Sequence, residues 1–241
     1  MALSISQTVA LSNVLKPKMK VCSFGYPDII APMDMLVNNF YMGESTVNYR
    51  ADSEAICKRH GINPRPIPDA ESFFETLGCK LHVYDIVRER GCEILQDLNR
   101  PMVKAAVYDV VLDVGTLEHC FNIAQAMMNM AGMVKVGGYI IHENPFLMGN
   151  HGFYGLNPTF YADFYKANGF ELLECKLATI DGRSASVSHT HRFKYEGAEC
   201  NVFAMARRVA IASFVFPVQS KYANVIPAAG VPSGEKETQN V

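Results

Sequence analysis

Short apolar runs alternate with helix-like segments along most of the chain. Three of these runs are rich in β-branched or aromatic residues and predict strands at Lys20–Phe24, Lys80–Asp85 and Tyr108–Asp113. The continuous apolar middle of Tyr108–Asp113 is typical of a strand that is buried on both faces. Shorter strands are expected at Glu93–Leu95 and Tyr139–His142. The pattern predicts an α/β fold with a Rossmann-like, doubly wound and mostly parallel sheet.

Helical periodicity follows several of these runs. An apolar stripe at i, i+3, i+4 and i+7 covers residues 117–134 and predicts one helix that the glycine pair at 137–138 stops. Two more helices are expected over Asp69–Leu77 and Phe160–Asn168, because a glycine follows each of them as a stop signal.

Late and irregular segments complete the predicted domain, which covers residues 1–222. Glu171–Ala178 and Asn201–Arg208 predict an antiparallel strand pair that closes the sheet. Residues 28–68 are rich in proline and interrupt the alternation, so we expect a lid-like insertion there. Residues 223–241 carry almost no large apolar side chains, which predicts a disordered tail.

Composition narrows the class of protein. Apolar residues make up 49% of the 241 residues, enough for a sizeable core, and the formal net charge of −2 includes no basic block, which argues against a nucleic-acid partner. The longest apolar stretch, Val209–Val218, is far shorter than the roughly 18 residues of a membrane span. Seven cysteines without a CxxC pair predict reduced thiols. A cytoplasmic protein with no membrane contact is expected.

Small or polar residues stand where the predicted parallel strands end. In an open parallel sheet, ligands bind beyond these carboxyl ends, at the point where the strand order reverses. The ends read Ser23-Phe24-Gly25, Asp85, Asp113-Val114-Gly115 and His142-Glu143-Asn144-Pro145. An acidic residue at the end of the second strand can accept both ribose hydroxyls of an adenine nucleoside, which gives Asp85 a role. A turn-initiating aspartate without a ligand is the alternative interpretation.

Two segments carry a resemblance to a known family. YDVVLDVGTLEHCFN at 108–122 and MVKVGGY at 133–139 resemble the fourth strand, its loop, and the following helix and strand of class I S-adenosylmethionine-dependent methyltransferases. The chain is similar in particular to a bacterial subgroup of mostly uncharacterised methyltransferase-like proteins. That narrower likeness is carried by Asp85, Gly91, Asp97-Leu98-Asn99-Arg100-Pro101, Asp113, Gly115-Thr116-Leu117-Glu118-His119 and His151-Gly152-Phe153-Tyr154.

The resemblance implies S-adenosyl-L-methionine as the cofactor. The residues it assigns to the donor pocket are Ser23, Gly25, Asp85, Asp97, Asp113, Gly115 and Glu118. The first loop of the family is normally a GxGxG sequence, whereas residues 22–28 read CSFGYPD, with a single glycine. A non-catalytic binding or scaffold protein with a degenerate donor loop is therefore an alternative. A nucleotide-dependent oxidoreductase is a further alternative, although no GxGxxG follows the first strand.

Three histidines are candidate catalytic bases. Methyl transfer from a sulfonium requires alignment of the reactants and a base for the acceptor's proton. His119 follows the fourth predicted strand, and His142 and His151 flank the loop after the fifth. We favour His151, because Gly152 permits close approach and the aromatic pair after it can wall a pocket. A histidine that only ties down the loop is the alternative.

These observations predict a methyltransferase that acts on an oxygen or nitrogen of a small molecule or sugar. We therefore expect the acceptor to be a small molecule or glycan. A homodimer is one alternative for the oligomeric state. No metal is predicted, because the spacing of His142, Glu143 and His151 is not a recognised ligand pattern. His189 and His191 alternate in an expected exposed hairpin, and two ligands do not make a metal site.

Overall fold

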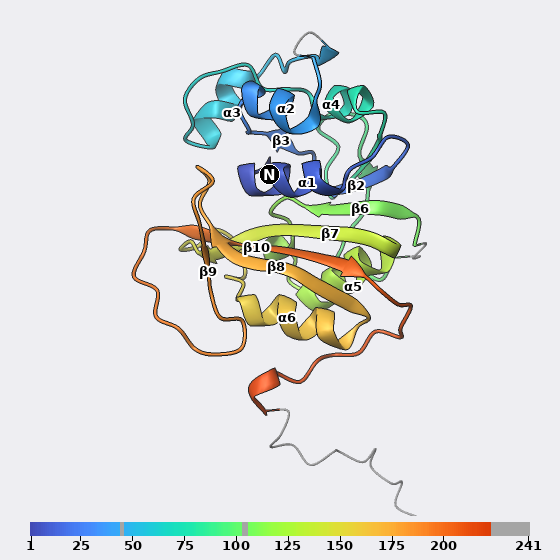
Figure 1. The fold of residues 1–241 in the computed structure, drawn as a ribbon, viewed down its shortest axis with the longest axis vertical. Coiled ribbons are helices and arrows are strands. Elements are labelled where there is room, and N and C mark those ends of the chain that lie inside the picture. The colour runs from blue at the N-terminus through green and yellow to red at the C-terminus, as the bar shows by residue number, and fades with distance from the viewer. Residues whose placement is uncertain (44–45, 103–105, 223–241) are drawn as a thin grey trace, which may run out of the picture.

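The computed structural model describes residues 1–43, 46–102 and 106–222, and it consists of a sheet with helices on both faces (Figure 1). The main sheet contains β2 (Lys20–Phe24), β4 (Lys80–Asp85), β5 (Ile94–Leu95), β6 (Tyr108–Asp113), β7 (Val134–Leu147), β8 (Phe170–Ala178), β9 (Ser184–Ser186) and β10 (Cys200–Arg208). The helices are α1 (Ile5–Val14), α2 (Met33–Phe40), α3 (Ser53–Arg59), α4 (Ala70–Thr76), α5 (Ile123–Met133) and α6 (Pro158–Ala167), with short 3₁₀ turns η2 (Leu117–His119) and η3 (Ser220–Tyr222).

The strand order confirms a doubly wound sheet. The order is β5-β4-β2-β6-β7-β10-β8-β9, and β5, β4, β2, β6 and β7 are mutually parallel. The chain adds strands on one side of β2 and then returns to add β6 and β7 on its other side. The order therefore reverses between β2 and β6, which is where such folds bind ligands. The predicted antiparallel pair is also confirmed, although β10 lies between β7 and β8 and pairs with both.

The core lies on both faces of the central strands. In β6, Val111 packs in a cluster with Met127 of α5 and Phe164 of α6, whereas its neighbours Val110 and Leu112 pack in the opposite cluster, with α1 and α4. Alternate side chains of a strand point to opposite faces, so a strand in this position is apolar throughout. The continuous apolar run at 108–113 was the correct signal for it.

The predicted helix over 117–134 is wrong in its extent. The structure has the 3₁₀ turn η2 and then a separate helix, α5. Oδ1 of Asp113 accepts hydrogen bonds from the amides of Thr116 (2.9 Å) and Leu117 (3.3 Å) and holds the start of η2 in a tight turn. Asn122 then caps the new helix by accepting from the amide of Gln125. The helix ends at Met133, and β7 begins before the glycine pair.

Two N-terminal elements have no counterpart in the predicted pattern. Helix α1 begins with a capping box between Ser4 and Gln7 and buries polar as well as apolar side chains. Ahead of it, β1 (Ala2–Leu3) forms a two-residue parallel ladder with β3 (Asp28–Ile29). The beginning of the chain is thereby tied to the segment that follows β2.

The segment 28–68 folds mainly into β3, α2 and α3, and α2 and α3 lie with α4 above the sheet in Figure 1. The expected tail at 223–241 lies outside the described residues. Within the described ranges, no helix combines the length and apolar character needed to cross a membrane.

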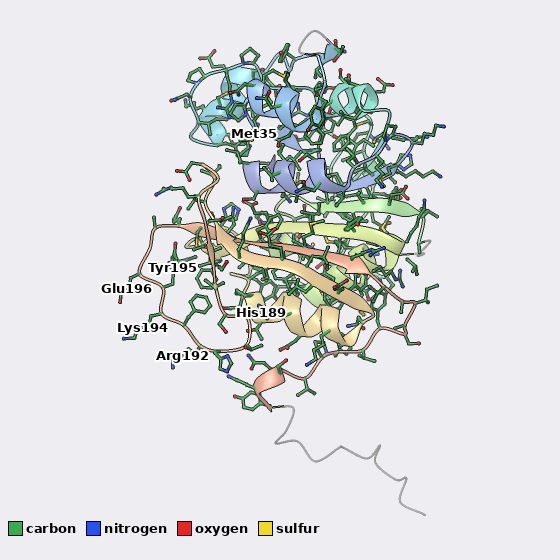
Figure 2. The ribbon with its side chains drawn as sticks, in the orientation of Figure 1. Met35, His189, Arg192, Lys194, Tyr195 and Glu196 are labelled. Atoms are coloured by element: carbon green, nitrogen blue, oxygen red, sulfur yellow. The ribbon has the colours of Figure 1, made fainter. Side chains whose placement is uncertain are left out.

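The expected hairpin around His189 and His191 is an irregular loop between β9 and β10. Figure 2 shows Arg192, Lys194 and Glu196 along the outer edge of this loop. A cavity of about 590 Å³ lies between the loop and α6, and Phe146 near the end of β7 is part of its lining.

Candidate functional site

A cavity of about 490 Å³ lies at the carboxyl ends of β6 and β7, beside the point where the strand order reverses. Its wall includes Gly115 and Glu118 after β6, Glu143 in β7, His151 from the following loop, and Arg59 and His60 at the end of α3. Segments that are far apart in the sequence therefore meet at the position where an α/β sheet holds its ligand.

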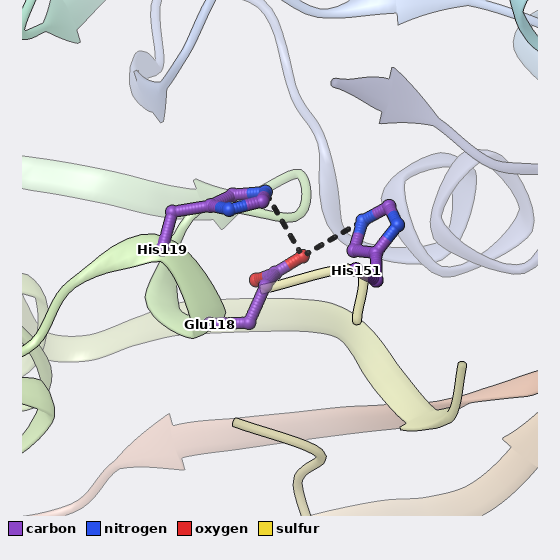
Figure 3. A group of neighbouring side chains, drawn as sticks. All are labelled: Glu118, His119 and His151. Atoms are coloured by element: carbon purple, nitrogen blue, oxygen red, sulfur yellow. Dashed lines mark ion pairs between the residues drawn. The ribbon is translucent and has the colours of Figure 1, made fainter. Parts of the chain in front are cut away.

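Glu118 is the buried centre of this wall (Figure 3). Its side chain is 1% exposed, and its Oε2 accepts a hydrogen bond of 2.9 Å from Nδ2 of Asn144. Its Oε1 faces Nε2 of His119 at 3.9 Å and Nε2 of His151 at 3.7 Å. Burial, reinforced by the charge of Asp113, raises the pKa of Glu118 to about 7.

The loop after β7 brings His151 to Glu118. The amide of Phe153 donates a 2.8 Å hydrogen bond to the Glu118 carbonyl, and a Cβ on Gly152 would lie 2.8 Å from that same oxygen. Only glycine permits this approach. The rings of His119 and His151 lie 5.4 Å apart, and both side chains are about half exposed, at 49% and 48%. Burial, and then the neighbouring His151, lower the pKa of His119.

His142 does not line the cavity. Its side chain is fully buried, with Nδ1 2.8 Å from Oδ2 of Asp113 and Nε2 hydrogen-bonded to the hydroxyl of Tyr165. Both ring nitrogens are engaged inside the core, away from the cavity, and the role of His142 as a catalytic base stays a prediction. His119 and His151 stay candidates.

Two of the residues predicted to bind the donor are also buried supports. The Ser23 hydroxyl donates to the carbonyl of Gly25 (2.7 Å), and the Asp113 side chain is 0% exposed and occupied by the turn after β6. Their side chains hold the strand ends in shape, and their contact with a donor stays a prediction.

The loops that follow β2 and β6 meet at Gly25 and Thr116. The Thr116 hydroxyl donates a 2.6 Å hydrogen bond to the carbonyl of Phe24 and so links the ends of β6 and β2. Gly25 and Gly115 have φ values of +88° and +89°, which favour glycine. The side chain of Met1 packs directly on Gly25, where a Cβ would lie 1.9 Å from its Sδ.

Asp85 and Asp97 do not line the cavity beside Glu118. Oδ1 of Asp85 accepts from the amides of Ile86 (2.7 Å) and Val87 (3.2 Å), and Oδ1 of Asp97 accepts from the amide of Asn99 (2.9 Å). Each aspartate caps a turn with one oxygen. In the described part of the chain, Oδ2 of Asp85 has no hydrogen-bond partner, so this oxygen is available to a ligand.

Sequence reasoning missed the contribution of α3. Asp28, whose side chain is 3% exposed, lies 3.1 Å from Nε2 of His60 and 3.3 Å from Nη1 of Arg59, and these contacts hold the end of α3 against the cavity. A buried aspartate close to two basic residues some thirty positions later is a pattern that many unrelated sequences share. No local signal could have identified it.

Glu143 closes the floor of the cavity. Ser4 donates a hydrogen bond to its Oε2, and Nδ2 of Asn201 donates to its Oε1 at 3.1 Å. Burial raises the pKa of Glu143. The partners come from the segment before α1 and from β10, so elements far apart in the sequence contribute to the site.

The fold is similar to solved structures of S-adenosylmethionine-dependent methyltransferases. The 1,6-didemethyltoxoflavin-N1-methyltransferase of Burkholderia thailandensis, crystallised with 1,6-didemethyltoxoflavin and S-adenosylhomocysteine, is 11% identical with a TM-score of 0.47 over 84% of this chain and 77% of its own. A methyltransferase of Aquifex aeolicus is 9% identical with a TM-score of 0.44 over 84% and 90%. No family model matches the chain, and no curated protein does. The likeness is one of fold.

Proposed function

We propose that the protein is an S-adenosylmethionine-dependent methyltransferase whose acceptor, a small molecule or glycan, enters the cavity beside Glu118. The observation that carries this proposal is the position of that cavity, at the carboxyl ends of β6 and β7 and next to the reversal of strand order. The motif at 108–122, whose sequence resembles methyltransferases, forms one wall of it.

The donor's place is the crevice over Gly25 and the turn after β6. The thioether of Met1 packs on Gly25 there, so the surface fits a methionine side chain, which is the chemical core of the donor. The donor would take the place of the Met1 side chain. Oδ2 of Asp85 would accept from the ribose hydroxyls, and Asp97 would contact the adenine end of the donor. When bound, the donor supplies a methyl group on a positively charged sulfur.

The acceptor's oxygen or nitrogen forms the new bond to the methyl carbon while the carbon–sulfur bond breaks. The electron pair of that bond stays on sulfur as a neutral thioether, and the acceptor's proton leaves to a base. His151 is the proposed base, with His119 and Glu118 beside it. Arg59 and His60 place the insertion at 28–68 on the opposite wall, which supports its proposed role as a lid.

Calorimetric titration with S-adenosylmethionine and with S-adenosylhomocysteine tests the proposal. We expect saturable binding at one site in the micromolar range, about −8 kcal/mol. Adenosine and methionine added separately serve as controls, because each offers only half of the contacts. Folded protein that binds neither ligand at millimolar concentration would overturn the proposal.

A non-catalytic methyltransferase-like binding protein is the second candidate. The single glycine at residue 25 and the side chain of Met1 packed on it favour this function. In that case the protein would bind no donor, while small molecules would still enter the cavity. The same titrations separate the two candidates.

A further inference from the structure

We infer that Glu118, His119 and His151 bind a divalent transition-metal ion at the wall of the cavity. One ligand atom from each of the three residues lies within 4.8 Å of the others, and the three side chains converge in Figure 3. Two histidines and one carboxylate on one side of an ion form a common protein ligand set for zinc and for non-haem iron, and they leave coordination positions open.

The separations match a site that closes on an ion. Ligand atoms at about 2.0–2.2 Å from a tetrahedral zinc ion are about 3.3–3.5 Å apart. Nε2 of His119 lies 3.9 Å and Nε2 of His151 lies 3.7 Å from Oε1 of Glu118, so these two separations need to contract by a few tenths of an ångström. One ligand atom from each residue lies within 4.8 Å of the others, and both imidazole rings are half exposed.

One oxygen of the carboxylate is turned toward the two histidines. Glu118 is 1% exposed, and its Oε2 accepts a hydrogen bond from Asn144. Oε1 faces the two Nε2 atoms at 3.7 Å and 3.9 Å, which is beyond hydrogen-bond distance. A cation between these three atoms would be held by one carboxylate oxygen and two imidazole nitrogens. Asn144, held by Tyr161, orients the carboxylate from behind.

The open coordination positions face the cavity. A ligand there offers an oxygen, such as a hydroxyl or carboxylate, and the ion lowers the pKa of a bound hydroxyl. With the ion bound, His119 and His151 are its ligands, so His151 no longer acts as the base of the proposed function. The ion would then promote loss of the acceptor's proton in its place. Only this last point rests on the proposed function, since metal binding itself does not require a methyl donor.

Titration of the chelator-treated full chain with ZnCl₂ by calorimetry, and with CoCl₂ by visible absorption, tests the inference. We expect one equivalent of Zn²⁺ to bind and Co²⁺ to give the absorption of a site with nitrogen and oxygen ligands. The His119→Ala/His151→Ala double variant should lose this binding by about 100-fold or more, which is about 2.7 kcal/mol. Glu118→Gln, which keeps an acceptor for Asn144, should lose most of it.

The matched control is the His189→Ala/His191→Ala double variant, which also removes two histidines but from the loop between β9 and β10. It should bind Zn²⁺ as the parent chain does. Absence of binding to the parent chain, or equal loss in both double variants, overturns the inference. If the Glu118→Gln variant does not fold, the His119→Ala/His151→Ala double variant still tests whether these residues bind the ion. Titration with S-adenosylhomocysteine alone reports on the donor, so failure of the proposed function is recognised separately.

Discussion

Two groups of acidic and histidine side chains lie at neighbouring strand ends and differ in their surroundings. Asp113 and His142 are 0% exposed, form a 2.8 Å contact, and are completed by Tyr165. Glu118, His119 and His151 are spaced at 3.7 Å and 3.9 Å, and both of their histidines are half exposed. The first group is closed by hydrogen bonds inside the core, whereas the second lies at the wall of the cavity.

The largest effect is expected from His142→Ala. Removal of this ring leaves the buried Asp113 carboxylate and the Tyr165 hydroxyl without their partner, so the free energy of unfolding should fall by about 3–5 kcal/mol. Urea denaturation measures it. His151→Ala is the control and should change stability by less than about 0.5 kcal/mol. Similar losses in the two variants would contradict the division between a supporting and a ligand-binding group.

The Asp85→Ala variant tests whether Asp85, which also follows a strand, binds a ligand as proposed for Glu118, His119 and His151. Loss of a charged hydrogen bond to the ribose should weaken S-adenosylhomocysteine binding by about 2 kcal/mol. Calorimetry measures the affinity. Asp181→Ala is the control, because Asp181 also closes a turn, through Thr179 and Arg183, outside the cavity. Unchanged affinity in folded Asp85→Ala would leave Asp85 as a turn residue.

The Gly25→Ala variant tests whether the backbone at Gly25 lies against the donor, as proposed. The positive φ of +88° should cost about 1–2 kcal/mol of stability, and the added Cβ collides with Met1 or with a ligand in its place. Gly137→Ala has a similar φ of +85° and open space around it, so it reports the backbone cost alone. Thermal denaturation and donor titration of both variants separate the two effects. Equal donor affinity in the two variants would show that the crevice does not hold the donor.

Glu143→Gln should give the smallest effect, and one that depends on pH. Burial raises the pKa of Glu143 in the folded state above its ordinary value of 4.5, so the folded protein holds this proton more tightly than the unfolded chain. Burial of Glu143 therefore does not lower the free energy of unfolding of the parent chain below pH 4.5. As the pH rises from 4.5 toward the folded-state pKa, the free energy of unfolding falls. The variant keeps partners for Ser4 and Asn201 and should gain at most about 1 kcal/mol at pH 8 and nothing at pH 4. A constant difference across pH would show that folding leaves the pKa of Glu143 unchanged.

The parts of the fold that depend on local pattern were predictable. The continuous apolar middle of residues 108–113 identified the central strand β6, because a strand covered on both faces places apolar side chains on both of them. Helix α1 was not predicted, since it buries Ser6, Gln7 and Thr8 and so shows no apolar stripe. The apolar stripe at 117–134 predicted one helix where the structure has η2 and α5. The spacing of apolar residues does not reveal that the side chain of Asn122 caps a separate helix.

The candidate site was predictable only where neighbours in sequence form it. Glu118 and His119 were recognised together, and His151 was selected from its position after a strand. Their convergence depends on Gly152 lying against the Glu118 carbonyl, a contact between distant segments that no spacing encodes. The prediction of no metal considered His142, Glu143 and His151, and the structure separates His142 from this group by burying it. Arg59 and His60 reach the cavity through the buried Asp28, which sequence alone did not connect with them.

The placement of β10 between β7 and β8 determines when the protein can fold on the ribosome. Residues 200–208 are translated after both neighbouring strands, yet they supply the hydrogen bonds that join them. Until these residues emerge, β7 and β8 each expose an unpaired edge of the kind that associates with other chains. At roughly 5–20 residues per second, the interval between the end of β8 and the end of β10 lasts a few seconds. During that interval the nascent chain is an expected client of chaperones that shield unpaired strands.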